Sequence, residues 1–89
     1  MNERVSRTSV VFAHSFLLPG VEGLQQPGIY EVETIEEPLE GVSFLAYRRV
    51  STTITVKGPT VLSRQLALID PLDLVAAIKR DAEASDGQP

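Results

Sequence analysis

The stretch GIYEVETIEEPLEGVSFLAYRRVSTTITV, residues 28–56, decides the fold because it holds two alternating segments joined by a short polar turn. In residues 28–37, apolar or β-branched side chains alternate with glutamates, and this period of two is typical of a half-buried β-strand. Residues 42–56 are rich in valine, threonine and aromatic side chains and predict a second, longer strand. Residues 38–41, Pro-Leu-Glu-Gly, supply turn chemistry. The stretch therefore predicts an antiparallel hairpin.

Two further strands and a helix flank this hairpin. Residues 9–18 alternate between two faces and stop at a Pro-Gly pair, so they predict a first strand. Residues 61–69 predict a fourth strand. Asp70 and Pro71 are favoured at the N-cap and the first position of a helix. The expected helix has an apolar stripe formed by Leu74, Val75, Ile78 and Ala82.

The order β-β-β-β-α predicts an α+β fold, a four-stranded antiparallel meander with a C-terminal helix on one face. A small half-open barrel is the alternative, because the long third strand could bend and belong to two sheets. We expect residues 1–8 to be a flexible N-terminus, residues 9–84 to form a single small α+β domain and residues 85–89 to be a disordered tail. A chain of 89 residues holds one hydrophobic core of modest stability, so a partner subunit would help.

Composition narrows the classes of function. With 43% hydrophobic and 22% charged residues, the chain is typical of globular proteins. It has no cysteine, which excludes disulfides, thiolate metal sites and a cysteine nucleophile. A net charge of −4 with scattered basic residues disfavours nucleic-acid binding. The apolar run of residues 10–18 is too short to span a bilayer, so we expect a cytoplasmic protein without a membrane partner. No nucleotide, metal or serine-hydrolase motif occurs, so we expect no cofactor.

The adjacent arginines Arg48 and Arg49 must point to opposite faces of their strand. A register with the turn centred on Leu39 keeps the apolar residues on one face, and it places Arg48 opposite Tyr30 on the buried side. Arg48 would then need a carboxylate or a ligand anion, since an unpaired buried charge is costly. Arg49 would lie on the outer face near Glu31. A β-bulge at the two arginines is the alternative, and it would leave both outside.

His14 is the only histidine, and it lies between Phe12 and Phe16 on the apolar face of the first predicted strand. One interpretation makes it a general base or an anion contact close to Arg48 and Tyr30. The other is a core or rim histidine that hydrogen-bonds a backbone carbonyl, and we favour it because no catalytic motif surrounds the residue. The candidate ligand-binding residues are therefore Arg48, Tyr30 and His14, with no catalytic or metal-ligating set.

Two stretches, PGIYEVETIEE (residues 27–37) and GVSFLAYRRVSTT (residues 41–53), resemble a family of small uncharacterised bacterial proteins, chiefly from alphaproteobacteria. Members share a P-x-G-x-Y-like opening, a V-E-T-D-E-E-like acidic turn and an S-F-x-A-Y-R-R segment. This chain has Ile35 where the family has the aspartate, and its Pro27 and Gly28 are adjacent. The resemblance covers about a third of the chain and implies a bacterial setting but no activity.

We expect the protein to be a non-enzymatic interaction module, a homodimer that binds a protein partner or a small anionic ligand near Arg48. A second apolar sheet face supports this expectation, because exposed apolar patches often mark interaction surfaces. The residues of that face are Val11, Ala13, Leu17, Leu45 and Tyr47. The alternative is a small enzyme or ligand-binding domain, and it requires His14, Arg48 and Tyr30 to converge on one pocket.

Overall fold

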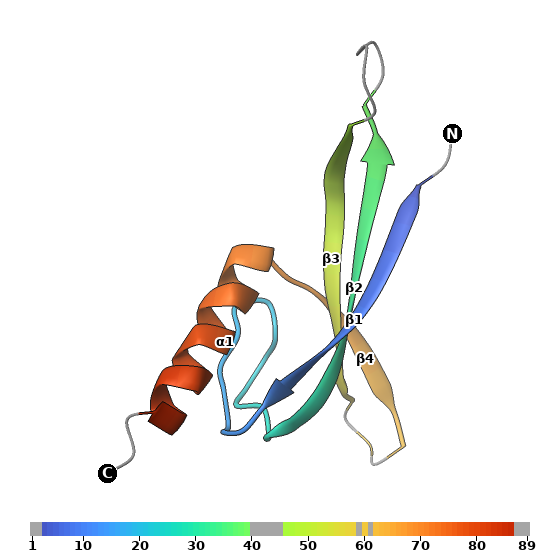
Figure 1. The fold of residues 1–89 in the computed structure, drawn as a ribbon. Helices are drawn as coiled ribbons and strands as arrows, with labels where there is room; N and C mark the ends of the chain where they lie inside the picture. The colour runs from blue at the N-terminus through green and yellow to red at the C-terminus, as the bar shows by residue number, and fades with distance from the viewer. Residues whose placement is uncertain (1–2, 40–45, 59, 61, 87–89) are drawn as a thin grey trace.

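The computed structural model describes residues 3–39, 46–58, 60 and 62–86, and it has four strands followed by one helix (Figure 1). The elements are β1 (Arg4–Phe12), β2 (Gly28–Pro38), β3 (Tyr47–Lys57), β4 (Arg64–Leu68) and α1 (Pro71–Asp86). The strands form one open antiparallel sheet in the order β1-β2-β3-β4. The predicted α+β meander with a C-terminal helix is therefore confirmed. Because the sheet stays open, the alternative of a half-open barrel is wrong.

The first strand begins and ends earlier than predicted. β1 starts at Arg4, so residues 4–8 belong to the sheet rather than to a separate N-terminal segment. It ends at Phe12, and the backbone N–H groups of the next two residues donate to the carboxylate of Asp81 in α1, both at 2.9 Å. These two bonds direct the chain away from the sheet and towards the helix, so the predicted continuation to residue 18 does not form.

Other boundaries also shift. The helix includes residues 85–86, which were expected in the tail, while residues 87–89 lie outside the described residues. The expected third strand included residues 42–45, which also lie outside the described residues; the observed β3 begins at Tyr47. β4 is shorter than predicted and pairs only with the second half of β3.

The pairing of β2 with β3 differs from the predicted register. Glu37 lies opposite Arg48, whereas the prediction placed Tyr30 there. The connection between the two strands spans residues 39–46 and is longer than the predicted turn. A longer connection moves every residue of β3 along β2, so the expected contact between Arg48 and Tyr30 is wrong.

A β-bulge in β3 is a second difference from the predicted pairing of β2 with β3. Ile35 pairs with Ser51, but the next residue of β2, Glu36, pairs with Arg49, so Val50 is the extra residue. A bulge reverses the side to which the following residues point. The alternative of a bulge was therefore right in kind, although it lies next to the arginine pair rather than at it. Arg49, like its neighbour, is exposed.

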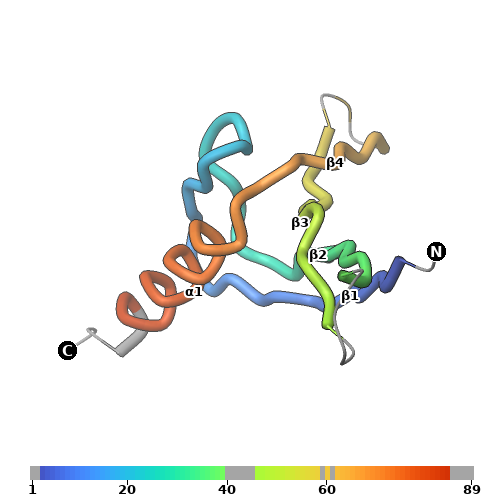
Figure 2. The backbone as a smooth tube through the Cα atoms, turned by 90° about the horizontal axis from the view of Figure 1, so that it is seen from above, coloured from blue at the N-terminus to red at the C-terminus, as the bar shows by residue number. Residues whose placement is uncertain are grey.

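The core lies between the sheet, α1 and the loop of residues 13–27, which Figures 1 and 2 show beside the helix. Phe12 and Phe16 stack with ring centroids 3.7 Å apart, and Tyr30 contacts both rings edge-on. Such aromatic pairs add to the stabilisation from burying apolar area. The remaining buried hydrophobic residues are Leu18, Val32, Ile54, Val56, Ile69, Leu74 and Ala77.

The helix begins as predicted but buries a different stripe. The Asp70 carboxylate accepts the backbone N–H of Leu72 at 2.8 Å, which is the expected N-cap bond. Leu74 and Ala77 are buried, at 8% and 2% exposure. The other members of the predicted stripe are exposed: Val75, Ile78 and Ala82. Only a narrow stripe of α1, with a spacing of three residues, is therefore part of the core.

The half of the sheet farther from α1 projects as a three-stranded ribbon, which we call the sheet arm (residues 4–8, 33–38 and 47–51; Figure 1). The molecule measures 52 × 35 × 18 Å as a result. Cross-strand ion pairs and one cation–π contact link the strands of the arm: Arg4–Glu36, Arg7–Glu33, Arg48–Glu37 and Arg4 over the Tyr47 ring. Within the described part of the chain, no helix is long and apolar enough to cross a membrane.

Candidate ligand-binding cleft

The three predicted site residues lie in three different places. Tyr30 is in the core, Arg48 is on the sheet arm and His14 is in the loop beside α1. Arg48 lies opposite Glu37, seven residues along β2 from Tyr30, and this separation is about 23 Å at 3.3 Å per residue. The pocket expected from these three residues is therefore not formed.

Arg48 has a carboxylate partner within the chain. Its Nε and Nη2 atoms both donate to Oε1 of Glu37, the former at 2.8 Å. The arginine side chain is 66% exposed, and an exposed pair of this kind stabilises a fold by at most about 1 kcal/mol. The predicted need for a ligand anion at Arg48 disappears, because the residue is neither buried nor unpaired.

His14 is also held by a partner, Asp81 of α1. The imidazole Nδ1 lies 3.0 Å from Oδ1 of Asp81, whose carboxylate also accepts the backbone N–H groups of Ala13 and His14. The bond from the Ala13 N–H, followed by the contacts with His14, holds the pKa of Asp81 below its ordinary value. The pair joins the start of the loop to the helix, so the structural interpretation of His14 is favoured, with a carboxylate in place of the expected carbonyl.

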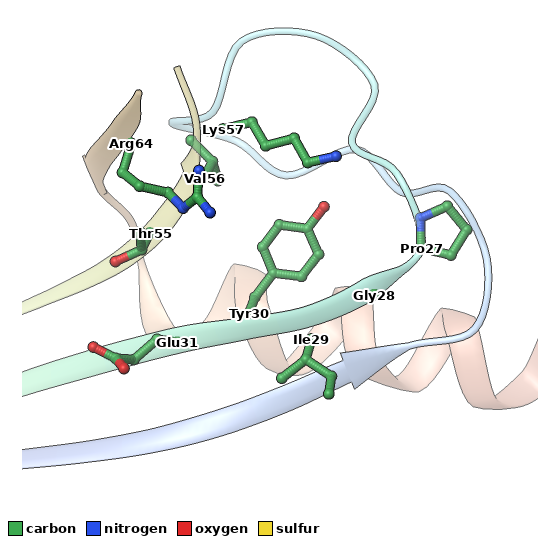
Figure 3. Close-up of a pocket in the computed structure, with 9 residues that line it drawn as sticks. All are labelled: Pro27, Gly28, Ile29, Tyr30, Glu31, Thr55, Val56, Lys57 and Arg64. Carbon is green, nitrogen blue, oxygen red and sulfur yellow. The ribbon is translucent and has the colours of Figure 1, made fainter. Parts of the chain in front are cut away.

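A cleft opens where β2 and β3 separate. Their pairing ends at Val32 and Ile54, and beyond these residues β2 stays paired with β1 while β3 stays paired with β4. The resulting cleft has a volume of about 480 Å³, which is within the range of small-molecule sites (Figure 3). It is lined by Pro27, Gly28, Ile29, Tyr30, Glu31, Thr55, Val56, Lys57 and Arg64.

Two cations stand at this cleft without an acidic partner in the described part of the chain. Lys57 and Arg64 are directly opposite each other on β3 and β4, and like charges in that position destabilise a sheet. Among the described residues, neither forms an ion pair, and the one hydrogen bond of the Arg64 guanidinium goes to the Ser63 carbonyl at 3.3 Å. Figure 3 shows the Arg64 guanidinium turned towards the Tyr30 ring, and the carboxylate of Glu31 turned away from Lys57. An anion in the cleft would relieve the repulsion.

Tyr30 supplies a rigid apolar wall between the two cations and the core. Its hydroxyl donates to the backbone carbonyl of Gln26 at 2.6 Å, and burial raises the pKa of the phenol. The ring of Phe16, 5.1 Å away between centroids, contacts Tyr30 from the core side. The buried Val56 lies across the cleft from Tyr30. The cleft thus combines positive charge at its mouth with an apolar surface inside.

The structure therefore keeps Tyr30 as a site residue and adds Lys57 and Arg64, which the sequence-based reasoning missed. The sequence held a signal for this pair, because Lys57 and Arg64 stand on either side of the turn between the third and fourth strands, and residues in such positions lie on neighbouring strands. In the described part of the chain, no group of three or more His, Cys, Asp or Glu side chains could hold a metal ion.

Comparison of the chain with models of protein families, with curated proteins and with solved structures finds no match.

Proposed function

We propose that the protein is a non-enzymatic binding module whose cleft holds a small anionic ligand between Lys57 and Arg64. The observation that carries the proposal is the opposed pair of cations at the cleft, which have no acidic partner among the described residues. Two positive groups on neighbouring strands complement the negative charge of a carboxylate and can donate charge-assisted hydrogen bonds to its oxygens. Binding then removes an unfavourable like-charge contact in addition to forming new ones.

The apolar interior of the cleft specifies the rest of the ligand. The Tyr30 ring and Val56 present carbon surface inside the cleft, whereas Lys57 and Arg64 stand at its mouth. A carboxylate attached to a flat apolar body would place its charge at the cations and its body against the tyrosine ring. Binding is favoured over catalysis because the only histidine pairs with Asp81 and lies outside this cleft.

The test is an NMR titration with benzoate, a flat carboxylate. We expect its largest shifts in the Tyr30 ring and in the backbone amides of Lys57 and Arg64, with weaker or no shifts for the neutral benzyl alcohol. Titration with inorganic phosphate separates a requirement for the apolar body from a requirement for charge alone. Equal shifts with benzoate and benzyl alcohol would overturn the proposed role of the cations.

Charge variants complete the test. Lys57→Gln and Arg64→Gln should each weaken benzoate binding roughly three- to fivefold, the effect of one exposed charge contact. Arg49→Gln is a matched control, because Arg49 is an exposed cation on β3 outside the cleft and has no ion pair among the described residues. It should bind benzoate as the unmodified protein does. A loss of binding in the Arg49 variant equal to that in the cleft variants would refute the assignment of the site.

A further inference from the structure

β1 is an edge strand, and one of its sides pairs with no strand in the part of the chain that the structure describes. The order of the sheet places it outside β2, and Figure 2 shows it along the margin of the molecule, with α1 beside only its Phe12 end. Natural edge strands are protected from pairing by charged side chains, prolines, bulges or short length. β1 has nine residues, no proline and a continuous pairing with β2, and its two charged side chains, Arg4 and Arg7, are ion-paired with glutamates of β2. The edge is therefore open to another strand.

We propose that β1 pairs antiparallel with β1 of a second copy of this chain, about a two-fold axis through Thr8. In this arrangement Arg4 of one copy lies opposite Phe12 of the other, and all nine residues of the strand are paired. Even-numbered residues then lie opposite even-numbered residues, and odd-numbered residues opposite odd-numbered ones. The backbone N–H and C=O groups that point away from β2 in one copy therefore face the corresponding groups of the other copy. The two sheets become one continuous sheet of eight strands.

The charge of Arg7 favours this register over the two registers in which the axis is moved by one residue. Moving the axis by one residue towards the N-terminus would place Arg7 directly opposite Arg7 of the second copy, and like charges in that position are destabilising. Moving it by one residue the other way places Arg7 opposite Val11 and leaves Arg4 unpaired. With the axis at Thr8, Arg7 lies opposite the small Ser9 instead. This is also the register with the most residue pairs.

The outer face of the sheet supports the same register through its apolar residues. Val11 is paired with Ile29, and Val5 is paired with Ile35. Val11, Ile29 and Val5 are 65%, 74% and 49% exposed, respectively, which is high for apolar residues on a sheet. In the proposed dimer, Val11 of one copy lies opposite Val5 of the other. Two apolar rows, each running from Ile29 of one copy to Ile35 of the other, then cross the interface.

A charged row crosses the interface between these apolar rows. Within one chain, Ser9 is paired with Glu31, which forms no ion pair among the described residues, and Arg7 is paired with Glu33. Because Ser9 lies opposite Arg7 of the second copy, that arginine is placed between its own Glu33 and Glu31 of the other chain. The two-fold axis repeats the contact, so each copy supplies the cation that the other copy's Glu31 lacks.

Disulfide trapping tests the register directly, because the chain has no cysteine. In Thr8→Cys the two Cα atoms would lie about 4.5–5.5 Å apart, and mild oxidation should link the two copies. In Ser6→Cys they would be displaced by four residues, about 13 Å, and no link should form. Linking of the Ser6 variant in place of the Thr8 variant would overturn the register. Linking of neither variant at high protein concentration would overturn the pairing of β1.

A second measurement does not depend on oxidation. The molar mass in solution should rise from monomer to dimer with protein concentration, and Val11→Lys should raise the dissociation constant roughly tenfold, since it places two cations in the apolar rows. Leu72→Lys is the control, because Leu72 is 74% exposed but lies on α1. Equal effects of the two lysines, or a monomer at all concentrations, would refute the proposal. Because β1 does not line the cleft, benzoate binding can persist if dimerisation fails, and the reverse also holds.

Discussion

Among the described residues, the buried hydroxyl group of Thr52 has no hydrogen-bond partner, and we expect its replacement by valine to stabilise the protein. The residue lies in β3 and is 3% exposed. Its Oγ1 has no hydrogen-bond partner among the described residues, although its backbone carbonyl accepts the N–H of Ile69 at 2.9 Å. Thr52→Val exchanges the hydroxyl for a methyl group of similar size and leaves the backbone bond in place. The substitution therefore removes only the desolvation penalty.

The magnitude follows from the cost of burying an unpaired hydroxyl. In proteins this cost is about 1–3 kcal/mol, and valine and threonine have similar preferences for strands. We expect the free energy of unfolding to rise by about 1–2 kcal/mol. For a domain of this size, each kcal/mol raises Tm by roughly 4–8 °C.

Urea denaturation followed by circular dichroism measures this change. The midpoint should move to higher urea, with an unchanged dependence of free energy on denaturant. Thr53→Val is a matched control, because Thr53 is the next residue and is only partly buried on the opposite face; its effect should stay within about 0.5 kcal/mol. A Thr52→Val protein that is no more stable than the Thr53→Val protein would show that the Thr52 hydroxyl is not left unpaired by folding.

Two further predictions concern the loop of residues 13–27 and its anchor. Because the pKa of Asp81 is lowered on folding, its carboxylate stabilises the fold above its ordinary value of 3.8, and this stabilisation is lost as the pH falls through 3.8 and the folded-state value. We expect Asp81→Asn to lower Tm at pH 7 and to flatten its fall in acid; parallel Tm–pH curves for the two proteins would contradict this. Gly20 has φ +96°, and a Cβ there would lie 2.7 Å from the Leu68 carbonyl oxygen. Gly20→Ala should therefore cost about 2–3 kcal/mol, more than Gly23→Ala, where φ is also positive but the space is open; equal losses in urea denaturation would rule out the clash.

Local signals predicted much of this fold. The alternation in residues 28–37 identified β2 to within one residue at its end, and Asp70 followed by Pro71 located the start of α1. Both features depend on neighbouring residues only: a strand shows its period along its own length, and an N-cap bonds the first turn that follows it. The number and order of the strands followed from the turns between them.

The site could not be predicted in the same way because it depends on pairing between distant residues. The bulge at Val50 and the long connection before β3 displaced Arg48 from Tyr30, and neither leaves a clear mark in the local pattern. The end of β1 is set by Asp81, which lies almost seventy residues away in sequence. The cleft arises where β2 and β3 part, and only the register of β3 with β4 brings Lys57 to Arg64.

The division of the sheet into a covered half and an arm means that the two ends of the molecule respond to different solution conditions. Around Ile54, which is fully buried, cohesion comes from the hydrophobic effect and weakens in urea or in the cold. In the sheet arm, cohesion comes from backbone hydrogen bonds, exposed ion pairs and the contact of Arg4 with the Tyr47 ring. Salt at 0.1–0.15 M screens exposed charges over a Debye length of about 8–10 Å. Higher ionic strength therefore loosens the far end of the sheet, including most of the β1 edge, and also screens the exposed cations of the cleft, while the apolar packing of the core is not screened.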